Sequence, residues 1–279
     1  LIAYTNGCHI YNANYGQIEG HDSVNNVDQN RLWTWTCRYG GYPGNGRDVV
    51  WLPNPADSLE FILLHTTLEL VTEPIVGTYV PGLYYSRLRK QAGQWVSVET
   101  NHLIKMDTLS HYIVGMRSRV NPNNWNILIP RANQVSFLSF TLSESGIQAD
   151  TTYDFSPTLR RVPYATSEDL RISPDGTKLC FYSMQDSMEG LYLFDYDEVS
   201  RSMRMRWHYQ FPIFKRSPFP SASFSPNGRY LYVNGISDSL WVTYAVYQID
   251  LESASPEEGI VKVAEWDGFL YDSPFAGLI

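Results

Sequence analysis

Short apolar segments separated by turn sequence recur along the chain, and two of these stretches are close copies of each other. Residues 170–181 read LRISPDGTKLCF, and residues 222–233 read ASFSPNGRYLYV. Each copy is an apolar strand, a Ser-Pro-Asx-Gly turn, a basic or polar residue and a second apolar strand. The copies lie about 50 residues apart, which is a propeller-blade period. We therefore expect the pairs Asp175-Gly176 and Asn227-Gly228 at equivalent places in successive blades, with the positive φ angles of tight hairpin turns.

Further apolar segments extend each copy to a four-stranded unit. A third strand follows at residues 191–197 and 246–252, and residues 203–209 and 260–265 supply the fourth. Weaker signals precede them, and no long stretch repeats apolar residues with the period of a helix. The remaining strand candidates are residues 1–5, 9–12, 49–52, 59–64, 82–88, 123–129 and 135–142, with residues 266–270 leading toward a further blade.

This pattern predicts an all-β fold, a β-propeller built of four-stranded antiparallel blades. The whole chain, residues 1–279, is expected to be one propeller segment of about four blades with partial blades at both ends. Because propellers usually close with four to eight blades, the segment is expected to be an incomplete part of a larger propeller. A long insertion is expected between the second and third strands of the first blade.

Composition agrees with sheets and makes nucleic acid an improbable partner. Aromatic residues make up 14% of the chain, and charged residues only 18%, against a usual level of about 25%. A formal net charge of -8 repels a polyanion, and no dense Lys/Arg run is present to neutralise phosphates. No apolar run reaches the ~18 residues of a membrane span, so we expect no nucleic-acid partner and no membrane-spanning segment.

The three cysteines leave at least one thiol unpaired within the chain. Cys180 lies in an apolar strand and is predicted to be an inert buried thiol. Cys8 and Cys37 lie beside turn sequence and are the pair that a disulfide would join, although the same spacing also fits two free thiols. A bridge closing ~30 residues would stabilise the fold by about 3 to 4 kcal/mol and would indicate an oxidising compartment.

Linear motifs for catalysis are missing. The six histidines form no His-x-x-x-His pair and no zinc spacing with cysteine. There is no Gly-x-Ser-x-Gly elbow, and the glycines of residues 40–46 precede no helix or P-loop lysine. The aspartates follow no calcium-loop pattern. We therefore predict no catalytic residue, no metal site and no cofactor.

One aromatic cluster is a candidate binding surface. Trp33, Trp35, Tyr39 and Tyr42 lie in a Gly/Asn-rich insertion, a combination that suits stacking on sugars or anchoring a protein partner. The alternative is that these rings cover the propeller core beneath a long loop.

Several strings resemble a known family. Residues 4–12 (YTNGCHIYN), Cys37 with residues 40–43 (GGYP), and residues 52–55 (LPNP) are similar to the opening of WD40-like propeller domains in large secreted Bacteroidetes proteins. The two Ser-Pro-Asx-Gly hairpins and residues 264–269 (AEWDGF) continue the resemblance over nearly the whole chain. It implies export by type IX secretion or gliding-associated systems, flanking PKD or Ig-like modules, and a Cys8–Cys37 disulfide.

The resulting functional prediction is a noncatalytic module, secreted or at the cell surface. It would serve adhesion or scaffolding by protein binding, with other protein chains, surface glycans or further domains of the same polypeptide as partners. The alternatives are a propeller enzyme of the lactonase or hydrolase type, and a glycan-binding propeller. A convergent cluster of carboxylate, histidine and amide groups would favour the enzyme.

Overall fold

A computed structural model places most of the residues that it describes in β-strands. It describes residues 3–5, 9–19, 24, 49–67, 69–71, 77–110, 112–132, 134–155, 168–184, 188–212, 221–236, 244–256 and 258–265. The chain divides into two compact units, Leu1–Thr166 and Ser167–Ile279. No helix occurs among the described residues, so none of them belongs to a helix that could cross a membrane.

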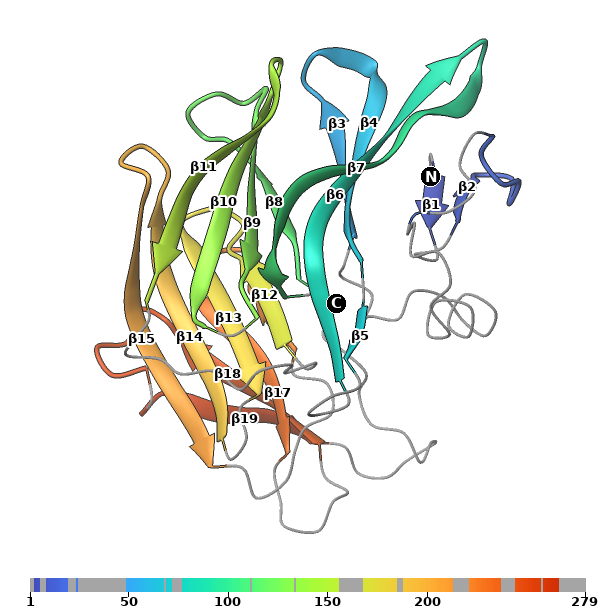
Figure 1. Cartoon of the computed structure of the whole chain (residues 1–279). Helices are drawn as coiled ribbons and strands as arrows, with labels where there is room; N and C mark the ends of the chain where they lie inside the picture. The colour runs from blue at the N-terminus through green and yellow to red at the C-terminus, as the bar shows by residue number, and fades with distance from the viewer. Residues whose placement is uncertain are drawn as a thin grey trace. The chain divides into compact units, whose positions relative to one another are not determined.

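The first unit contains two larger sheets and one small hairpin. Strands β3, β4, β6 and β7 form an antiparallel meander, and β5 adds to the free end of β6 (Figure 1). Strands β8 to β11 form a second meander in chain order, and β1 pairs with β2. The strands are β1 (Ala3–Thr5), β2 (Ile10–Asn12), β3 (Val49–Asn54), β4 (Asp57–Thr66), β5 (Glu69–Val71), β6 (Gly77–Gln91), β7 (Gln94–Leu109), β8 (Val114–Arg117), β9 (Trp125–Pro130), β10 (Ser136–Ser143) and β11 (Gly146–Asp154).

The second unit contains two further four-stranded meanders, each in chain order. Their strands are β12 (Glu168–Ile172), β13 (Lys178–Met184), β14 (Met188–Asp197), β15 (Ser202–Pro212), β16 (Ala222–Phe224), β17 (Tyr230–Ile236), β18 (Tyr244–Asp250) and β19 (Ile260–Glu265). The predicted fold class, an all-β propeller of four-stranded antiparallel blades, is confirmed. The assignment of residues 1–279 to a single segment with partial blades at both ends stays a prediction.

The two Ser-Pro-Asx-Gly turns are equivalent hydrogen bond by hydrogen bond. Each joins the first and second strands of its blade, β12 to β13 and β16 to β17. In the first turn the Gly176 N–H donates to the Ser173 carbonyl at 2.8 Å, and in the second Gly228 donates to Ser225 at 2.8 Å. The serine hydroxyl then accepts the backbone N–H five residues on, at 2.9 Å and 2.8 Å. The predicted equivalence is therefore confirmed.

The conformation of these turns differs from the predicted tight hairpin. Only the glycine of each pair has positive φ, 68° at Gly176 and 67° at Gly228, while the Asx residue does not. A proline at the second position and a glycine at the fourth are typical of a type I turn. The Asx side chain instead accepts the N–H two residues on, at 3.1 Å for Asp175 and 3.2 Å for Asn227.

This turn chemistry predicts a pH dependence that one substitution should remove. Burial alone would raise the pKa of Asp175, but the hydrogen bonds from Ser173 and Thr177 outweigh it and lower the pKa to about 2. The ionised carboxylate therefore stabilises the fold above the unfolded-state pKa of 3.8, and this contribution is lost as the pH falls through about 2. Because the side chain is half exposed, we expect less than about 1 kcal/mol.

The test is Asp175→Asn, which copies the natural Asn227 of the second turn. Urea unfolding measures the free energy of unfolding of both proteins between pH 6 and pH 2. The wild type should be more stable than the variant at pH 6, and this difference should shrink as the pH falls. The reciprocal Asn227→Asp serves as the matched control and should gain the same dependence. Parallel curves for wild type and Asp175→Asn would contradict the assignment.

Alternating side chains bury the inner faces of the sheets. In the first unit one core joins the β3–β4–β6–β7 meander to the β8–β11 sheet, and Leu64, Leu83, Ile127 and Phe140 are among its buried members. A second core packs the other face of β4 and β6 against the β2 segment through Ile10 and neighbouring apolar residues. A fully buried leucine or phenylalanine contributes roughly 1.5–3 kcal/mol, so these two layers fix the β4, β6 and β7 backbones.

The second unit has one core between its two blades, which includes Leu193, Leu231 and Ile249. Cys180 belongs to this core as a free thiol, fully buried as predicted, and burial raises its pKa well above the ordinary value. Asp169 is also fully buried, where its Oδ2 accepts the Ala222 N–H of the neighbouring blade at 2.7 Å.

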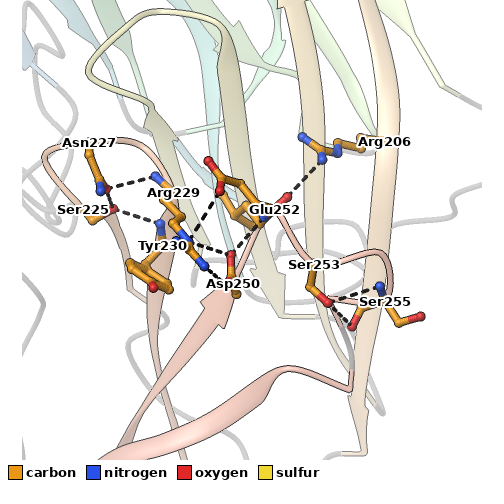
Figure 2. Close-up of polar contacts among 10 residues, drawn as sticks. Arg206, Ser225, Asn227, Arg229, Tyr230, Asp250, Glu252, Ser253 and Ser255 are labelled. Atoms are coloured by element: carbon orange, nitrogen blue, oxygen red, sulfur yellow. Dashed lines mark hydrogen bonds and ion pairs between the residues drawn. The ribbon is translucent and has the colours of Figure 1, made fainter.

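A cluster of charged side chains lies beside the turn of the blade formed by β16 to β19 (Figure 2). The Arg229 guanidinium donates to both carboxylate oxygens of Asp250, at 2.7 Å and 3.3 Å, and lies 5.0 Å over the Tyr230 ring. The hydrogen bond from Arg229 lowers the pKa of Asp250, so the pair stays charged. From the preceding blade, Arg206 Nη2 donates to the Leu251 carbonyl at 2.9 Å. The turn, the third strand and the neighbouring blade are thus tied at one point.

Candidate functional site

A cluster of titratable side chains lies on the sheet formed by β4, β6 and β7. Glu60 of β4 is only 3% exposed, and its Oε1 accepts the Asn54 amide at 2.6 Å. The Arg87 guanidinium of β6 lies between two carboxylates, with Nε 3.1 Å from Glu60 Oε1 and Nη1 3.4 Å from Glu99 Oε2. One cation therefore joins a buried carboxylate to a partly exposed one.

The second carboxylate is contacted by a phenol and an imidazole. The Tyr85 hydroxyl donates to Glu99 Oε1 at 3.2 Å, and His102 Nδ1 lies 3.0 Å from the same oxygen. The Tyr85 and His102 rings lie side by side, with centroids 4.8 Å apart. With Glu60 and Arg87, these residues form what we call the Glu99 cluster: Glu60, Tyr85, Arg87, Glu99 and His102.

A β-bulge in β7 brings Glu99 and His102 together. In a regular strand, side chains three residues apart point to opposite faces of the sheet. Here Tyr85 pairs with His102 while Arg87 pairs with Glu99, so β7 carries one residue more than β6 over this interval. Asn101, at the extra position, has the unusual φ of 51°. The inserted residue shifts the alternation of side chains by one position, so Glu99 and His102 point to the same face of the sheet.

Burial and charge keep the Tyr85 phenol protonated. Burial, followed by the charge of Glu99, raises the pKa of Tyr85, so the phenol keeps its proton and donates it to the carboxylate. A carboxylate at Nδ1 favours the imidazole tautomer whose proton is on that nitrogen. The lone pair of His102 Nε2 is then available, on a side chain that is 55% exposed.

This arrangement can perform general base chemistry. An imidazole oriented by a carboxylate, with the opposite nitrogen open to solvent, can take a proton from water or a hydroxyl group. The Arg87 cation on the same face can stabilise negative charge that develops on a nearby oxygen. The described residues contain no group of three or more His, Cys, Asp or Glu side chains arranged to hold a metal ion.

The structure does not describe the site residues that were predicted from the sequence. Cys8 and Cys37, the proposed disulfide, and the aromatic cluster of Trp33, Trp35, Tyr39 and Tyr42 are all outside the described residues. Their pairing and their role in binding stay predictions.

Sequence reasoning missed every member of the Glu99 cluster. Two signals were available: the Glu-x-x-His spacing of Glu99 and His102, and a charged residue inside an apolar strand, where Glu60 interrupts the run from Leu59 to Leu64. A buried carboxylate requires a partner, and this requirement pointed to a neighbouring cation.

Comparisons with known proteins give the fold class and no family. No protein-family model and no curated protein matches the chain. Solved structures do match. A periplasmic gluconolactonase from Pseudomonas aeruginosa is similar over 79% of this chain and 67% of its own, with 15% identity and a TM-score of 0.43. A β-propeller domain from Vanderwaltozyma polyspora is similar over 93% and 80%, with 13% identity and a TM-score of 0.42.

A third similar structure is a proposed 6-phosphogluconolactonase from Bacteroides fragilis. It covers 77% of this chain and 83% of its own, with 11% identity and a TM-score of 0.36. The sequence-based exclusion of catalysis is contradicted by these neighbours, two of which are described as lactonases. The Glu99 cluster brings together side chains from three strands, β4, β6 and β7.

Proposed function

We propose that this chain is a propeller hydrolase that cleaves a small ester or lactone at the Glu99 cluster. The observation that carries the proposal is the His102–Glu99 pair, with Nδ1 3.0 Å from Oε1 on an imidazole that is half exposed. In acyl transfer, a carboxylate beside an imidazole orients the base that activates the nucleophile. The Arg87 guanidinium supplies positive charge on the same face.

The reaction balances with these groups alone. His102 Nε2 takes a proton from water, and the water oxygen attacks the carbonyl carbon. The carbonyl electrons move to its oxygen, where Arg87 stabilises the negative charge. Collapse of this intermediate breaks the bond between the carbon and the ring or alkoxy oxygen, and the imidazolium returns its proton to the departing oxygen. The product is a hydroxy acid, or an acid and an alcohol.

The test is a pH-stat assay of the purified chain against aldonolactones and simple esters. We expect acid release that saturates with substrate concentration and exceeds the uncatalysed rate. Release that rises linearly with substrate, or that survives in His102→Ala, would show that the cluster is not the active site.

Secretion and flanking modules were predicted from sequence resemblance, and protein partners and surface glycans from the aromatic cluster. All of them stay predictions. A lactonase or esterase is compatible with an exported location, so neither proposal decides the other.

A further inference from the structure

The residues that hold the β7 bulge lie on the opposite face of the sheet from the Glu99 cluster. Ser86 lies between Tyr85 and Arg87 on β6 and is fully buried. Its Oγ accepts the Asn101 backbone N–H at 3.0 Å, at the residue with φ of 51°. The same Oγ lies 3.4 Å from Nε2 of His65, which is also fully buried.

This contact replaces a hydrogen bond that regular pairing would have supplied. The hydrogen-bond ladder is irregular between the pairs Tyr85–His102 and Arg87–Glu99. Over this interval β7 has one residue more than β6, so one β7 residue has no cross-strand partner. A backbone N–H that leaves the regular ladder needs another acceptor. The Ser86 hydroxyl provides an acceptor at the site of the bulge. Its own proton can be donated to the His65 ring, which stacks on Tyr84 at 6.0 Å.

We infer that Ser86 and Asn101 are positioning residues that keep Glu99 and His102 on one face of the sheet. Without the bulge, the three-residue spacing would put the two side chains on opposite faces and separate the imidazole from its carboxylate. Ser86 contacts neither side chain of the pair and acts only through the β7 backbone. This inference rests on the proposed function for its catalytic meaning, but its geometry can be tested without any substrate.

The readout is the tautomer of His102, followed by ¹⁵N NMR of histidine-labelled protein. His102 is assigned by the resonance that disappears in His102→Ala. In the wild type we expect the neutral ring to carry its proton on Nδ1. His208 provides an internal reference, because it is the cross-strand partner of Tyr192, stacked at 6.2 Å, and no described carboxylate lies within ion-pair distance of it.

Three variants separate the bulge from general stability. Ser86→Ala removes the acceptor, and Asn101→Val puts a β-branched residue at positive φ, which is strongly disfavoured. Both should lose the Nδ1–H tautomer of His102 while His208 keeps its own signature. Asn101→Gly adopts positive φ freely and should keep the wild-type tautomer. Thermal unfolding of each variant confirms that the comparison is between folded proteins.

Rates give the second readout. A displacement of about 1 Å at a reacting group can lower a rate roughly 10²-fold. We therefore expect Ser86→Ala and Asn101→Val to reduce kcat/KM by about that factor and Asn101→Gly to retain it. If Ser86→Ala and Asn101→Val keep the wild-type tautomer, or if folded Asn101→Gly loses it, the inference is overturned. If the wild type hydrolyses nothing while Ser86→Ala still loses the tautomer, the proposed function fails and the positioning role stands.

Discussion

Replacing Asp169 with alanine is expected to lower the free energy of unfolding by about 3 kcal/mol. The carboxylate is fully buried between two blades, where it accepts the Ala222 N–H at 2.7 Å and lies 3.1 Å from Arg171 Nε. Its removal leaves a buried donor unsatisfied and a guanidinium without its counter-ion. The expected loss is at the lower end of the range for breaking a buried ion pair, because the Arg171 side chain is 27% exposed and retains contact with water.

The matched control is Asp195→Ala in the same unit. Asp195 forms an ion pair of the same length, 3.1 Å to Arg204 Nη2, but its side chain is 35% exposed and that of Arg204 is 82% exposed. Exposed pairs of this kind contribute less than about 1 kcal/mol. Urea unfolding followed by tryptophan fluorescence measures both variants. Equal losses for Asp169→Ala and Asp195→Ala would show that the inter-blade contact does not decide stability.

The blades of the second unit could be predicted from sequence because their signals are local. A Ser-Pro-Asx-Gly turn determines which residues can form hydrogen bonds within six positions, and the flanking apolar residues must then pair across it. The two copies repeat these signals, so the equivalence of Gly176 and Gly228 followed directly. The role of Asp169 did not, because its partner Ala222 lies 53 residues away and donates only a backbone N–H.

The first unit was harder to predict because its apolar pattern does not show the register shifts between its strands. Strand β6 runs from Gly77 to Gln91, far beyond the predicted residues 82–88, and it pairs with β7 through several register shifts. A strict alternation of two assigns Glu99 and His102 to opposite faces and hides the pair. A bulge is not visible in a binary pattern, particularly when its αL residue is an asparagine and not a glycine. Two features set it: the hydrogen bond from the Asn101 N–H to Ser86 Oγ and the positive φ of Asn101.

His102→Ala is expected to reduce kcat/KM for an ester or lactone by about 10²- to 10⁴-fold, the range for loss of a general base. Stability should change by less than about 0.5 kcal/mol, since the side chain is half exposed. His208→Ala is the matched control: it removes a cross-strand, ring-stacked histidine from β15, also the fourth strand of its blade, and should leave the rate unchanged.

Glu99→Gln keeps the shape of the orienting group but removes its charge, so a loss of kcat/KM approaching that of His102→Ala is expected. If His102→Ala and His208→Ala lower the rate equally, the histidine at the bulge is not the base, and if Glu99→Gln retains full activity, the carboxylate does not orient it.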